Sequence, residues 1–370
     1  MASEQNNRGA FLIQQHYCEA NAAPIYGRMC AAVAAGLTRD SVVGARILDW
    51  PGEPTRDALP LRFFGKDDGL AAVLAGVVTE QAEIVATLER VLADHEAALL
   101  PWLDGPPQTN EPGRSAALML GLIEIARARG PKIELLEIGS SAGLNLLIDR
   151  YRFDLGGTFY GPEDSPVTIK PVWSGPPVPV VPLEIVSVRG CDVQPLDATD
   201  PTVAARLAAY VWPETPERLV RVRAAIAMQV ERGVDLVRAD AADWVEARLA
   251  EPQEAGVTRV LMHSVVWQYL PEPVAERIRA AMKAAGARAS AERPLGWVMM
   301  EPDRDLHRHE VRVQGWPGAA PMELVAPTHA HGAWVEATFP RRSWIAVELH
   351  RGARDARRLQ HLRELGATLG

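Results

Sequence analysis

The spacing of apolar and polar positions changes character about a third of the way along the chain. Residues 8 to 100 carry Ala-rich and Leu-rich segments with apolar side chains at helical spacing and no strand-like alternation. Breaker residues separate these segments at Pro51, Gly52, Pro54 and Pro60. This part of the chain therefore predicts a helical domain, which we place at residues 1–111.

Short apolar runs then alternate with helical patterns from residue 112 to 340. The predicted strands of the alternating part lie at 133–138, 180–191, 235–238, 258–266 and 295–300, followed by strand-like segments at 310–316, 322–326 and 332–339. Strands that alternate with helices favour a parallel sheet covered on both faces. We expect a Rossmann-like, doubly wound α/β domain at 112–340 that is mostly parallel, with antiparallel strands at its end. Residues 341–370 would form a basic C-terminal extension.

The stretch KIELLEIGSSAGLNLLID, residues 132–149, is the centre of this predicted domain. It reads as a strand, a tight turn and a helix that restarts at residue 144. Gly139 and Gly143 would let the backbone bend sharply and approach a ligand closely. The first N–H groups of the helix would be aimed outward, which suits an anionic or polar ligand group.

Polar residues follow the apolar strands at their C-terminal ends. In open α/β sheets ligands bind at this edge, beside the point where the strand order reverses. The rule selects one residue at or near the C-terminal end of each of the five main strands: Glu137, Asp192, Asp240, His263 and Glu301. We expect these side chains to converge.

Composition and charge limit the classes of partner. The 370 residues are 48% hydrophobic and 23% charged, with a formal net charge of −8. This balance argues against a general nucleic-acid or anionic-membrane surface and favours a small-molecule substrate. The three cysteines form no C-x-x-C motif, and no leader or membrane-spanning run stands out, so we expect a cytoplasmic protein. The pattern does not indicate an oligomeric state.

The sequence EIGSSAG resembles the first motif of class I S-adenosylmethionine-dependent methyltransferases. The segments RGCDVQP and VRADAADW look like the acidic second and third strand ends of that fold. The resemblance implies S-adenosylmethionine as cofactor, with Asp192 binding the ribose hydroxyls and Asp240 with Ala241 contacting the adenine. It also assigns the cofactor to the residues of the turn, namely Glu137, Gly139, Ser140, Ser141 and Gly143.

Four longer segments are similar to a bacterial family of uncharacterised methyltransferase-like proteins, over residues 10 to 340. They are TNEPGRSAAL, EIGSSAGLNLLIDRY, HSVVWQYLP and HAHGAWVE. The family has no established activity, so the resemblance bears on the fold more than on the function.

Methyl transfer depends mainly on positioning the acceptor and excluding water, and it needs a base when the acceptor is protonated. The candidate catalytic residues are His263, Tyr269 and Glu301, which follow the fourth and fifth strands. The candidate substrate-binding residues are Asn110, Arg114 and Trp267. Asn110 and Arg114 are equally suited to a helix cap and a salt bridge at the start of the helix near residue 112.

Two other functions stay open. The same turn matches G-x-S-x-G, so Ser141, Asp303 and His331 could form the triad of an α/β-hydrolase esterase, although no strands or oxyanion loop precede it. The second is a non-catalytic protein that binds a nucleotide-like ligand. The pairs His307 with His309 and His329 with His331 could hold a metal, but exposed or capping histidines explain them better, and we predict no metal site.

Overall fold

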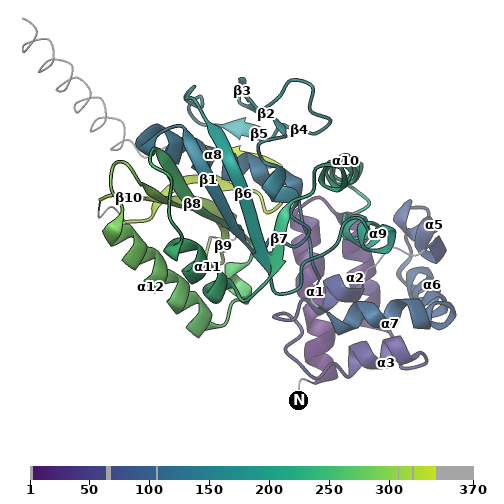
Figure 1. Ribbon diagram of the computed structural model, residues 1–370. Coiled ribbons are helices and arrows are strands. Elements are labelled where there is room, and N and C mark those ends of the chain that lie inside the picture. Colours follow the sequence, from purple (N-terminus) through teal and green to yellow (C-terminus); the bar gives the residue numbers. More distant parts are fainter. Residues whose placement is uncertain (1–2, 64–67, 106, 307, 319–320, 339–370) are drawn as a thin grey trace, which may run out of the picture. The chain divides into compact units, whose positions relative to one another are not determined.

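The computed structural model describes residues 3–63, 68–105, 107–306, 308–318 and 321–338 (Figure 1). These residues form two compact units. The first unit comprises the chain up to Asn110 together with Leu196–Val230, and the second comprises Glu111–Pro195 together with the described residues from Glu231 onward. We refer to them as the helical unit and the α/β unit. The predicted extension at 341–370 lies outside the described residues.

The helical unit is built around a core of its own. Its described helices are α1 (Glu4–Ala20), α2 (Pro24–Gly36), α3 (Val42–Leu48), α4 (Leu59–Phe63), η1 (Asp68–Leu70), α5 (Ala71–Leu74), α6 (Gln81–Asp94), α7 (Glu96–Asp104), α9 (Pro201–Ala209) and α10 (Pro216–Arg232). Apolar residues of α1, α2, α3 and α6, such as Phe11, Met29, Ile47 and Leu88, are almost fully buried in this core. The prediction of a helical N-terminal region is thus confirmed in its secondary structure.

Residues 196–230 depart from the predicted domain boundaries, because they group with the helical unit instead of the α/β unit. Trp212, in the link between α9 and α10, is 5% exposed and packs between Tyr17 and Tyr26, with ring centroids 6.0 and 5.8 Å away. Glu214 accepts hydrogen bonds from the first N–H groups of α2, including that of Tyr26 at 3.0 Å. Through these contacts the segment packs in the helical unit and not in the α/β unit.

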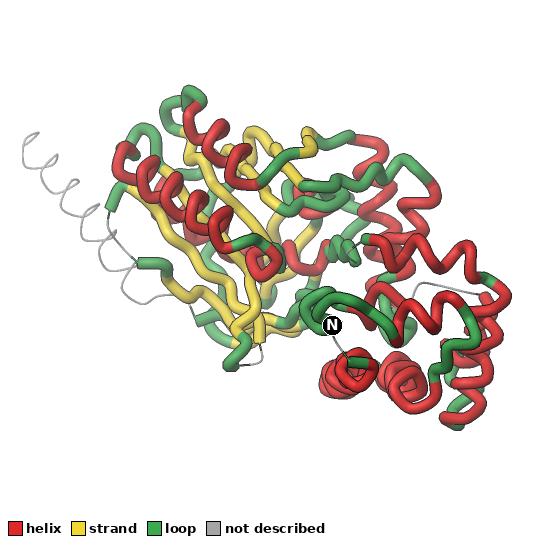
Figure 2. Tube along the Cα trace, turned by 90° about the horizontal axis from the view of Figure 1, so that it is seen from below, coloured by secondary structure: helices red, strands yellow, loops and turns green. Residues whose placement is uncertain are grey.

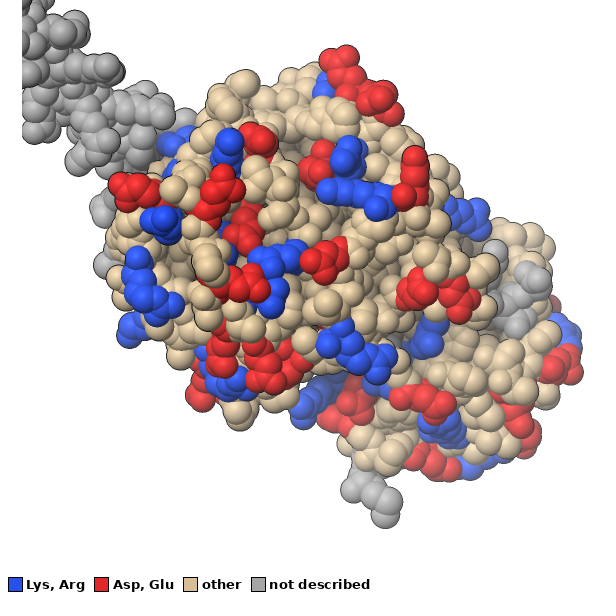
Figure 3. Space-filling view, viewed as in Figure 1, with Lys and Arg blue, Asp and Glu red and all other residues tan. Residues whose placement is uncertain are grey.

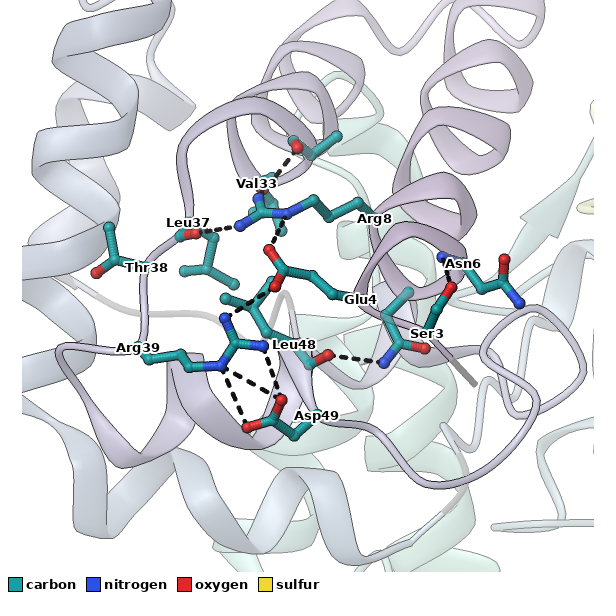
Figure 4. Close-up of polar contacts among 12 residues, drawn as sticks. Ser3, Glu4, Asn6, Arg8, Val33, Leu37, Thr38, Arg39, Leu48 and Asp49 are labelled. Carbon is teal, nitrogen blue, oxygen red and sulfur yellow. Dashed lines mark hydrogen bonds and ion pairs between the residues drawn. The ribbon is translucent and has the colours of Figure 1, made fainter. Parts of the chain in front are cut away.

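A polar cluster ties α1 to the ends of α2 and α3 (Figure 4). The Arg8 guanidinium donates to the carbonyls of Val33 and Leu37, at 3.1 and 2.6 Å, where α2 ends. Its Nε also donates to Glu4 at 2.8 Å, and Glu4 in turn binds Arg39. Because the last carbonyls of a helix lack partners within it, Arg8 acts as a side-chain cap for α2.

The α/β unit contains a nine-stranded sheet among its described residues. In chain order its elements are η2 (Pro112–Arg114), α8 (Ser115–Arg129), β1 (Lys132–Ile138), η3 (Leu144–Leu147), β2 (Arg152–Leu155), β3 (Thr158–Tyr160), β4 (Thr168–Ile169), β5 (Val172–Ser174), β6 (Glu184–Asp192), β7 (Asp235–Arg238), α11 (Ala241–Ala250), β8 (Val257–Ser264), η4 (Trp267–Tyr269), α12 (Glu272–Arg288), β9 (Leu295–Asp303), β10 (Arg308–Trp316), β11 (Glu323–Thr328) and β12 (Trp334–Glu336). The strand order is β5-β12-β11-β10-β9-β8-β1-β6-β7. Strands β2, β3 and β4 make a separate small sheet, with a turn at Gly156 and Gly157 between β2 and β3.

Five neighbouring strands, β9, β8, β1, β6 and β7, run parallel, and β10, β11 and β12 continue the sheet in antiparallel fashion. The chain starts at β1, moves out through β6 and β7, and returns to the other side of β1 with β8. The strand order therefore reverses at β1. This confirms a mixed α/β fold with a mostly parallel central sheet.

Helices cover both faces of the sheet, as the alternation of side chains along the strands shows. Leu261 and Trp297 pack with α11 and α12 on one face. Val298, next to Trp297 in the strand, points to the other face, where it meets α8 closely at Gly121. In Figure 2 the strands form one twisted layer with helices packed against it.

Acidic and basic side chains are interspersed on the face of the α/β unit that carries α11 and α12 (Figure 3). This agrees with the modest net charge of the chain. Among the described residues, no helix combines the length and the apolar character needed to cross a membrane.

Candidate functional site

The bend after β1 is a run of left-handed backbone conformations. Gly139, Ser141 and Gly143 have φ values of +67°, +54° and +75°. A side chain at Gly139 would collide with Val266, which lies 2.4 Å from the position of a Cβ. The two glycines are therefore required by the conformation and by close packing, as the sequence predicts.

The helix expected after this bend is absent. Residues Leu144–Leu147 form one turn of 3₁₀ helix, after which the chain enters the β2–β3 hairpin. Asn145 is fully buried and its Oδ1 accepts a hydrogen bond from the Ser115 hydroxyl at 2.9 Å. The Tyr151 hydroxyl donates to the Leu144 carbonyl. These tertiary bonds override the local helical pattern, so the bend has no extended helix N-terminus to bind an anion.

Asp192, at the end of β6, lies directly over this bend. Its Oδ2 accepts a hydrogen bond from the Ser141 N–H at 2.9 Å, and its Oδ1 accepts one from the Gln194 N–H at 2.8 Å. Its carbonyl accepts from Ala239 N–H at the end of β7. The carboxylate is thus fixed in orientation, and each oxygen keeps a lone pair for another donor.

Glu137, at the end of β1, is 1% exposed. Its Oε2 has no hydrogen-bonding partner among the described residues. Burial raises the pKa of Glu137 to about 8, and the charge of Asp192 adds to this rise, whereas a hydrogen bond from Ser140 and the charge of Arg114 oppose it. At neutral pH the side chain is therefore mainly a neutral acid that can donate a proton.

His263, at the end of β8, is fully buried and both of its ring nitrogens are bonded. Trp297 Nε1 donates to His263 Nε2 at 3.0 Å, and His263 Nδ1 lies 2.7 Å from Glu301 Oε1. An indole N–H can only donate, so we assign the proton of a neutral imidazole to Nδ1. The ring also stacks on Trp267 with a centroid distance of 5.0 Å. No ring nitrogen is left to act on a substrate, which makes His263 a positioning residue instead of the predicted base.

Glu301, at the C-terminal end of β9, is held by three donors at one oxygen. Besides His263, the backbone N–H groups of Val266 and Trp267 donate to Oε1 at 3.2 and 3.3 Å. Val265 has φ +54°, a strained value for a β-branched residue, and this turns the following amides toward Glu301. The second oxygen, Oε2, is buried without a partner among the described residues. Glu301 therefore remains a candidate general base.

Four other predicted site residues have structural roles or lie apart. Asp240 is the N-cap of α11, with Oδ1 accepting from the N–H groups of Ala242 and Asp243, and Ala241 is the first residue of that helix. Tyr269 is 58% exposed. Trp267 packs its indole between His263 and the Arg279 guanidinium.

The segment before α8 contains the predicted substrate-binding residues Asn110 and Arg114. Glu111, not Asn110, caps the short helix η2 by accepting from Gly113 N–H at 2.8 Å. Arg114 is 5% exposed and its Nε donates to the Ala330 carbonyl at 3.0 Å. Its charge acts on Glu137, Tyr269 and His309, so it lies near the edge of the sheet where β1, β8 and β9 end. Asn110 is buried, at the end of the helical unit.

The histidine pairs lie at the same edge of the antiparallel strands, apart from His307, which lies outside the described residues. His309 in β10 pairs with Thr328 in β11, and His329 follows it. Burial lowers the pKa of His309 to about 4, assisted by the charges of Arg114 and His329. Within the described parts of the chain, no three His, Cys, Asp or Glu side chains gather closely enough to hold a metal.

The proposed triad is not assembled. Ser141 Oγ is buried and has no hydrogen-bonding partner in the described chain. Asp303 Oδ1 accepts from the N–H groups of Asp305 and Leu306, which makes it a turn residue. Every strand of the large sheet among the described residues begins at Lys132 or later, so none precedes the bend.

Trp297, which fixes the tautomer of His263, was not among the residues predicted from the sequence. A signal for it was present, because Trp297, Met299 and Glu301 alternate along one strand and therefore share a face. The backbone amides that hold Glu301 were not predicted either. Their direction depends on the strained turn at Val265, which the sequence does not reveal.

Comparison with known proteins places the chain in a family. Residues 8–337 match a family described as "Uncharacterized protein conserved in bacteria (DUF2332)". The chain belongs to this family. The match spans both units, so the helical unit and the α/β unit are parts of one DUF2332 protein.

Two curated relatives match only short pieces of this DUF2332 protein. An error-prone DNA polymerase of Dechloromonas aromatica is 45% identical over 71 residues, which are 18% of this chain and 7% of the polymerase. An error-prone DNA polymerase of Pseudomonas savastanoi pv. phaseolicola is 51% identical over 41 residues, which are 11% and 4% of the two chains. Matches this short carry no argument for a shared function. No solved structure matches the chain.

Proposed function

We propose that the protein is an S-adenosylmethionine-dependent methyltransferase that acts on a small-molecule acceptor. The observation that carries the proposal is the Asp192 carboxylate, held over the left-handed bend between Gly139 and Gly143 by two backbone N–H groups. A carboxylate fixed in this way has lone pairs free for the two hydrogens of a vicinal diol, which is what an adenosyl ribose offers.

The strand order gives further support. The five parallel strands, numbered as they follow in the chain, lie in the order 3-2-1-4-5, which is the order of doubly wound nucleotide-binding sheets. Ligands of such sheets bind where the order reverses, and here this point is the end of β1. Glu137, Asp192 and Glu301 all come from strand ends at this edge.

The residues present fit the cofactor in their hydrogen-bonding capacity. Glu137 Oε2 and Ser141 Oγ are buried polar atoms without partners among the described residues, and the Ser141 N–H donates to Asp192. Groups of this kind normally have a hydrogen-bonding partner, so their lack of one points to a ligand. The amino acid part of the cofactor would lie against the Gly139–Gly143 bend, and its ribose against Asp192.

When bound, S-adenosylmethionine supplies a methyl group on a sulfonium, which passes to the nucleophile of an acceptor. Where that nucleophile carries a proton, Glu301 Oε2 would accept it, because Oε1 is occupied by His263 and two backbone amides. His263 and Trp297 hold the carboxylate in place.

Calorimetric titration with S-adenosylmethionine and S-adenosylhomocysteine tests the proposal. We expect both to bind the wild type, and Asp192→Asn to weaken both by about tenfold or more, since charged hydrogen bonds contribute about 1.5–3 kcal/mol. Asp235→Asn, an exposed carboxylate at the start of β7, is the matched control and should bind as the wild type does.

The same titrations separate the two alternative functions. The absence of any binding to the wild type, combined with labelling of Ser141 by a fluorophosphonate, would replace the proposal with a serine hydrolase. The specific observation behind that alternative is the left-handed Ser141 in a G-x-S-x-G turn. Binding of S-adenosylmethionine without turnover across a broad acceptor panel would favour a ligand-binding protein without catalysis.

A further inference from the structure

The α/β unit has a hollow along helix α12. It is a groove of about 920 Å³ between α12 and the face of strands β9 and β10. Trp267 lies in its wall, at η4, and Trp316 at the far end of β10. A volume of this size is typical of small-molecule sites.

The groove exists because the helices on this face stop at α12. Among the described residues between β9 and β10, no helix covers the outer strands on this side. The opposite face of the same strands is covered by α8, which packs closely against Val298 at Gly121. Met299 and Trp297, which is 7% exposed, therefore form the floor of the groove.

The walls of the groove are aromatic. Trp267 and Trp297 lie 5.6 Å apart at an interplanar angle of 57°, and both contact His263. At the other end, Trp316 packs so closely on α12 that a Cβ on Gly286 would lie 2.5 Å from its indole. Flat rings at both ends suit a flat, apolar ligand, since aromatic pairs stack in offset or edge-to-face arrangements.

The charges of the lining have one sign. Arg279 and Lys283 stand one turn apart on α12 and both line the groove, whereas its lining contains no Asp or Glu. Arg279 lies 5.2 Å above the Trp267 ring and pairs with the exposed Glu272 at 2.7 Å. No ion pair of Lys283 occurs within the described residues. This local cationic rim contrasts with the net charge of −8 of the whole chain.

We propose that this groove is a binding site for a planar aromatic anion, such as an aromatic carboxylate or sulfonate. The aromatic body would lie between the tryptophans, and its acidic group would reach Lys283 and Arg279. Because Trp267 and Trp297 both contact His263, the occupied groove adjoins the residues that hold Glu301. The site does not depend on the proposed methyltransferase activity.

The test is a fluorescence titration of the full chain with two probes that differ in charge. The first is 8-anilinonaphthalene-1-sulfonate, and the second is its neutral counterpart N-phenyl-1-naphthylamine. We expect Lys283→Met to weaken the sulfonate about fivefold and to leave the neutral probe within twofold, as for the loss of one partly solvated charge contact. Arg288→Met, an exposed cation of the same helix outside the groove lining, should change neither.

A second variant tests the location of the site. Ala287 is exposed and lines the groove, so Ala287→Trp should fill it and abolish the binding of both probes. Circular dichroism and thermal unfolding of each variant establish that the fold is kept. Loss of fluorescence with an unchanged fold supports the proposal.

Two outcomes would overturn it. The helical unit has an apolar cavity of about 450 Å³ that Ala205 and Arg223 line. Probe binding that survives Ala287→Trp and is lost in Ala205→Trp would move the site to that cavity. Sedimentation that shows a dimer of the wild type, dissociated by Ala287→Trp, together with no binding of either probe, would make the groove a contact between two copies of the chain.

Discussion

Glu137 makes the stability of the protein depend on pH in an unusual direction. Its pKa is about 8 in the folded chain and near 4.5 when exposed, so the folded state holds the proton more tightly. Stability should therefore fall as pH rises from about 4.5 to 8 and stay level above that range. Glu137→Gln has no carboxyl proton to lose, so it should be more stable than the wild type at pH 8. The difference in the free energy of unfolding should be several kcal/mol at most, because one unit of difference between the folded and unfolded pKa corresponds to about 1.4 kcal/mol.

Urea denaturation of the wild type and Glu137→Gln at pH 5, 6.5 and 8 measures the effect. The advantage of the variant should grow with pH across this series. Glu163→Gln, an exposed carboxylate in a loop of the same unit, should show no such trend. A constant difference between Glu137→Gln and wild type at all three pH values would contradict the raised pKa.

His309 should make the stability of the protein fall as the pH is lowered, which is the opposite direction to the effect of Glu137. Burial lowers its pKa from about 6.5 to about 4, so the unfolded chain takes up the proton first as the pH falls. Stability should be lost as the pH drops from about 6.5 to 4. We expect His309→Gln to be less sensitive to acid over this range in thermal unfolding, and the exposed His16→Gln to behave as the wild type does. If thermal unfolding of His309→Gln and wild type changed with pH in the same way, this would be evidence against the lowered pKa of His309.

At the scale of single residues, the sequence predicts which side chains lie at the ligand edge but not what they bind. Glu137, Asp192 and Glu301 follow apolar strands, and parallel strands bring their ends to one edge. The bonding of His263 depends on Trp297, and this contact exists only because β8 and β9 pair in a particular register. The register is set by tertiary packing, which the pattern of one strand does not contain.

At the scale of elements, most strands and helices of the α/β unit follow from periodicity. The strand predicted at 235–238 coincides with β7, and the strand predicted at 133–138 lies within β1. The helix after the bend fails because LNLL suits a helix locally, whereas Asn145 and Tyr151 bind partners that demand another path. Local helix propensity predicts the conformation poorly where hydrogen bonds of buried polar side chains determine it.

The end of helix α2 gives a prediction at this scale. Arg8 binds the carbonyls of Val33, Ala34 and Leu37, and its side chain is 24% exposed. Arg8→Ala removes the charged donor from these carbonyls, although Val33 still accepts a hydrogen bond from the Leu37 N–H. We therefore expect the free energy of unfolding, measured by urea denaturation, to fall by about 2–3 kcal/mol. Arg8→Lys should recover only part of it, because an ammonium cannot reproduce the planar fork.

The control for this prediction lies in the same cluster. Arg39 pairs with Glu4 and Asp49 on the surface and caps no carbonyl in the cluster of Figure 4. Salt screens exposed pairs strongly, so Arg39→Ala should cost clearly less than Arg8→Ala. Equal losses in both variants would show that the ion pairs, and not the capping of α2, hold this corner together.

At the scale of the whole molecule, the sequence predicts two regions but misplaces one segment. The change from helical to alternating patterns marks the start of the α/β unit close to residue 111. Residues 196–230 look like an ordinary crossover between two strands, because their helical pattern is the same whichever core they join. Only the burial of Trp212 against α1 and α2 assigns them to the helical unit.

Separate cores should open separately. Trp212 is 5% exposed in the core of the helical unit, and Trp244 is 7% exposed in the α11–α12 core of the α/β unit. Replacing either tryptophan by alanine leaves a cavity, which should lower the free energy of unfolding by about 3–5 kcal/mol. Because local opening follows the cooperative unit that is weakened, hydrogen exchange of the full chain should report where each loss falls.

We expect Trp212→Ala to speed exchange in peptides of α1, α2 and α10 while β1 and β8 keep their protection, and Trp244→Ala to give the reverse pattern. Mass spectrometry of peptic fragments resolves these elements in one experiment. Faster exchange throughout the chain in both variants would mean that the two cores unfold as one cooperative body. The interruption of the helical unit by the α/β fold would then serve to couple them, since the chain crosses between the units at Asn110, Pro195 and Val230.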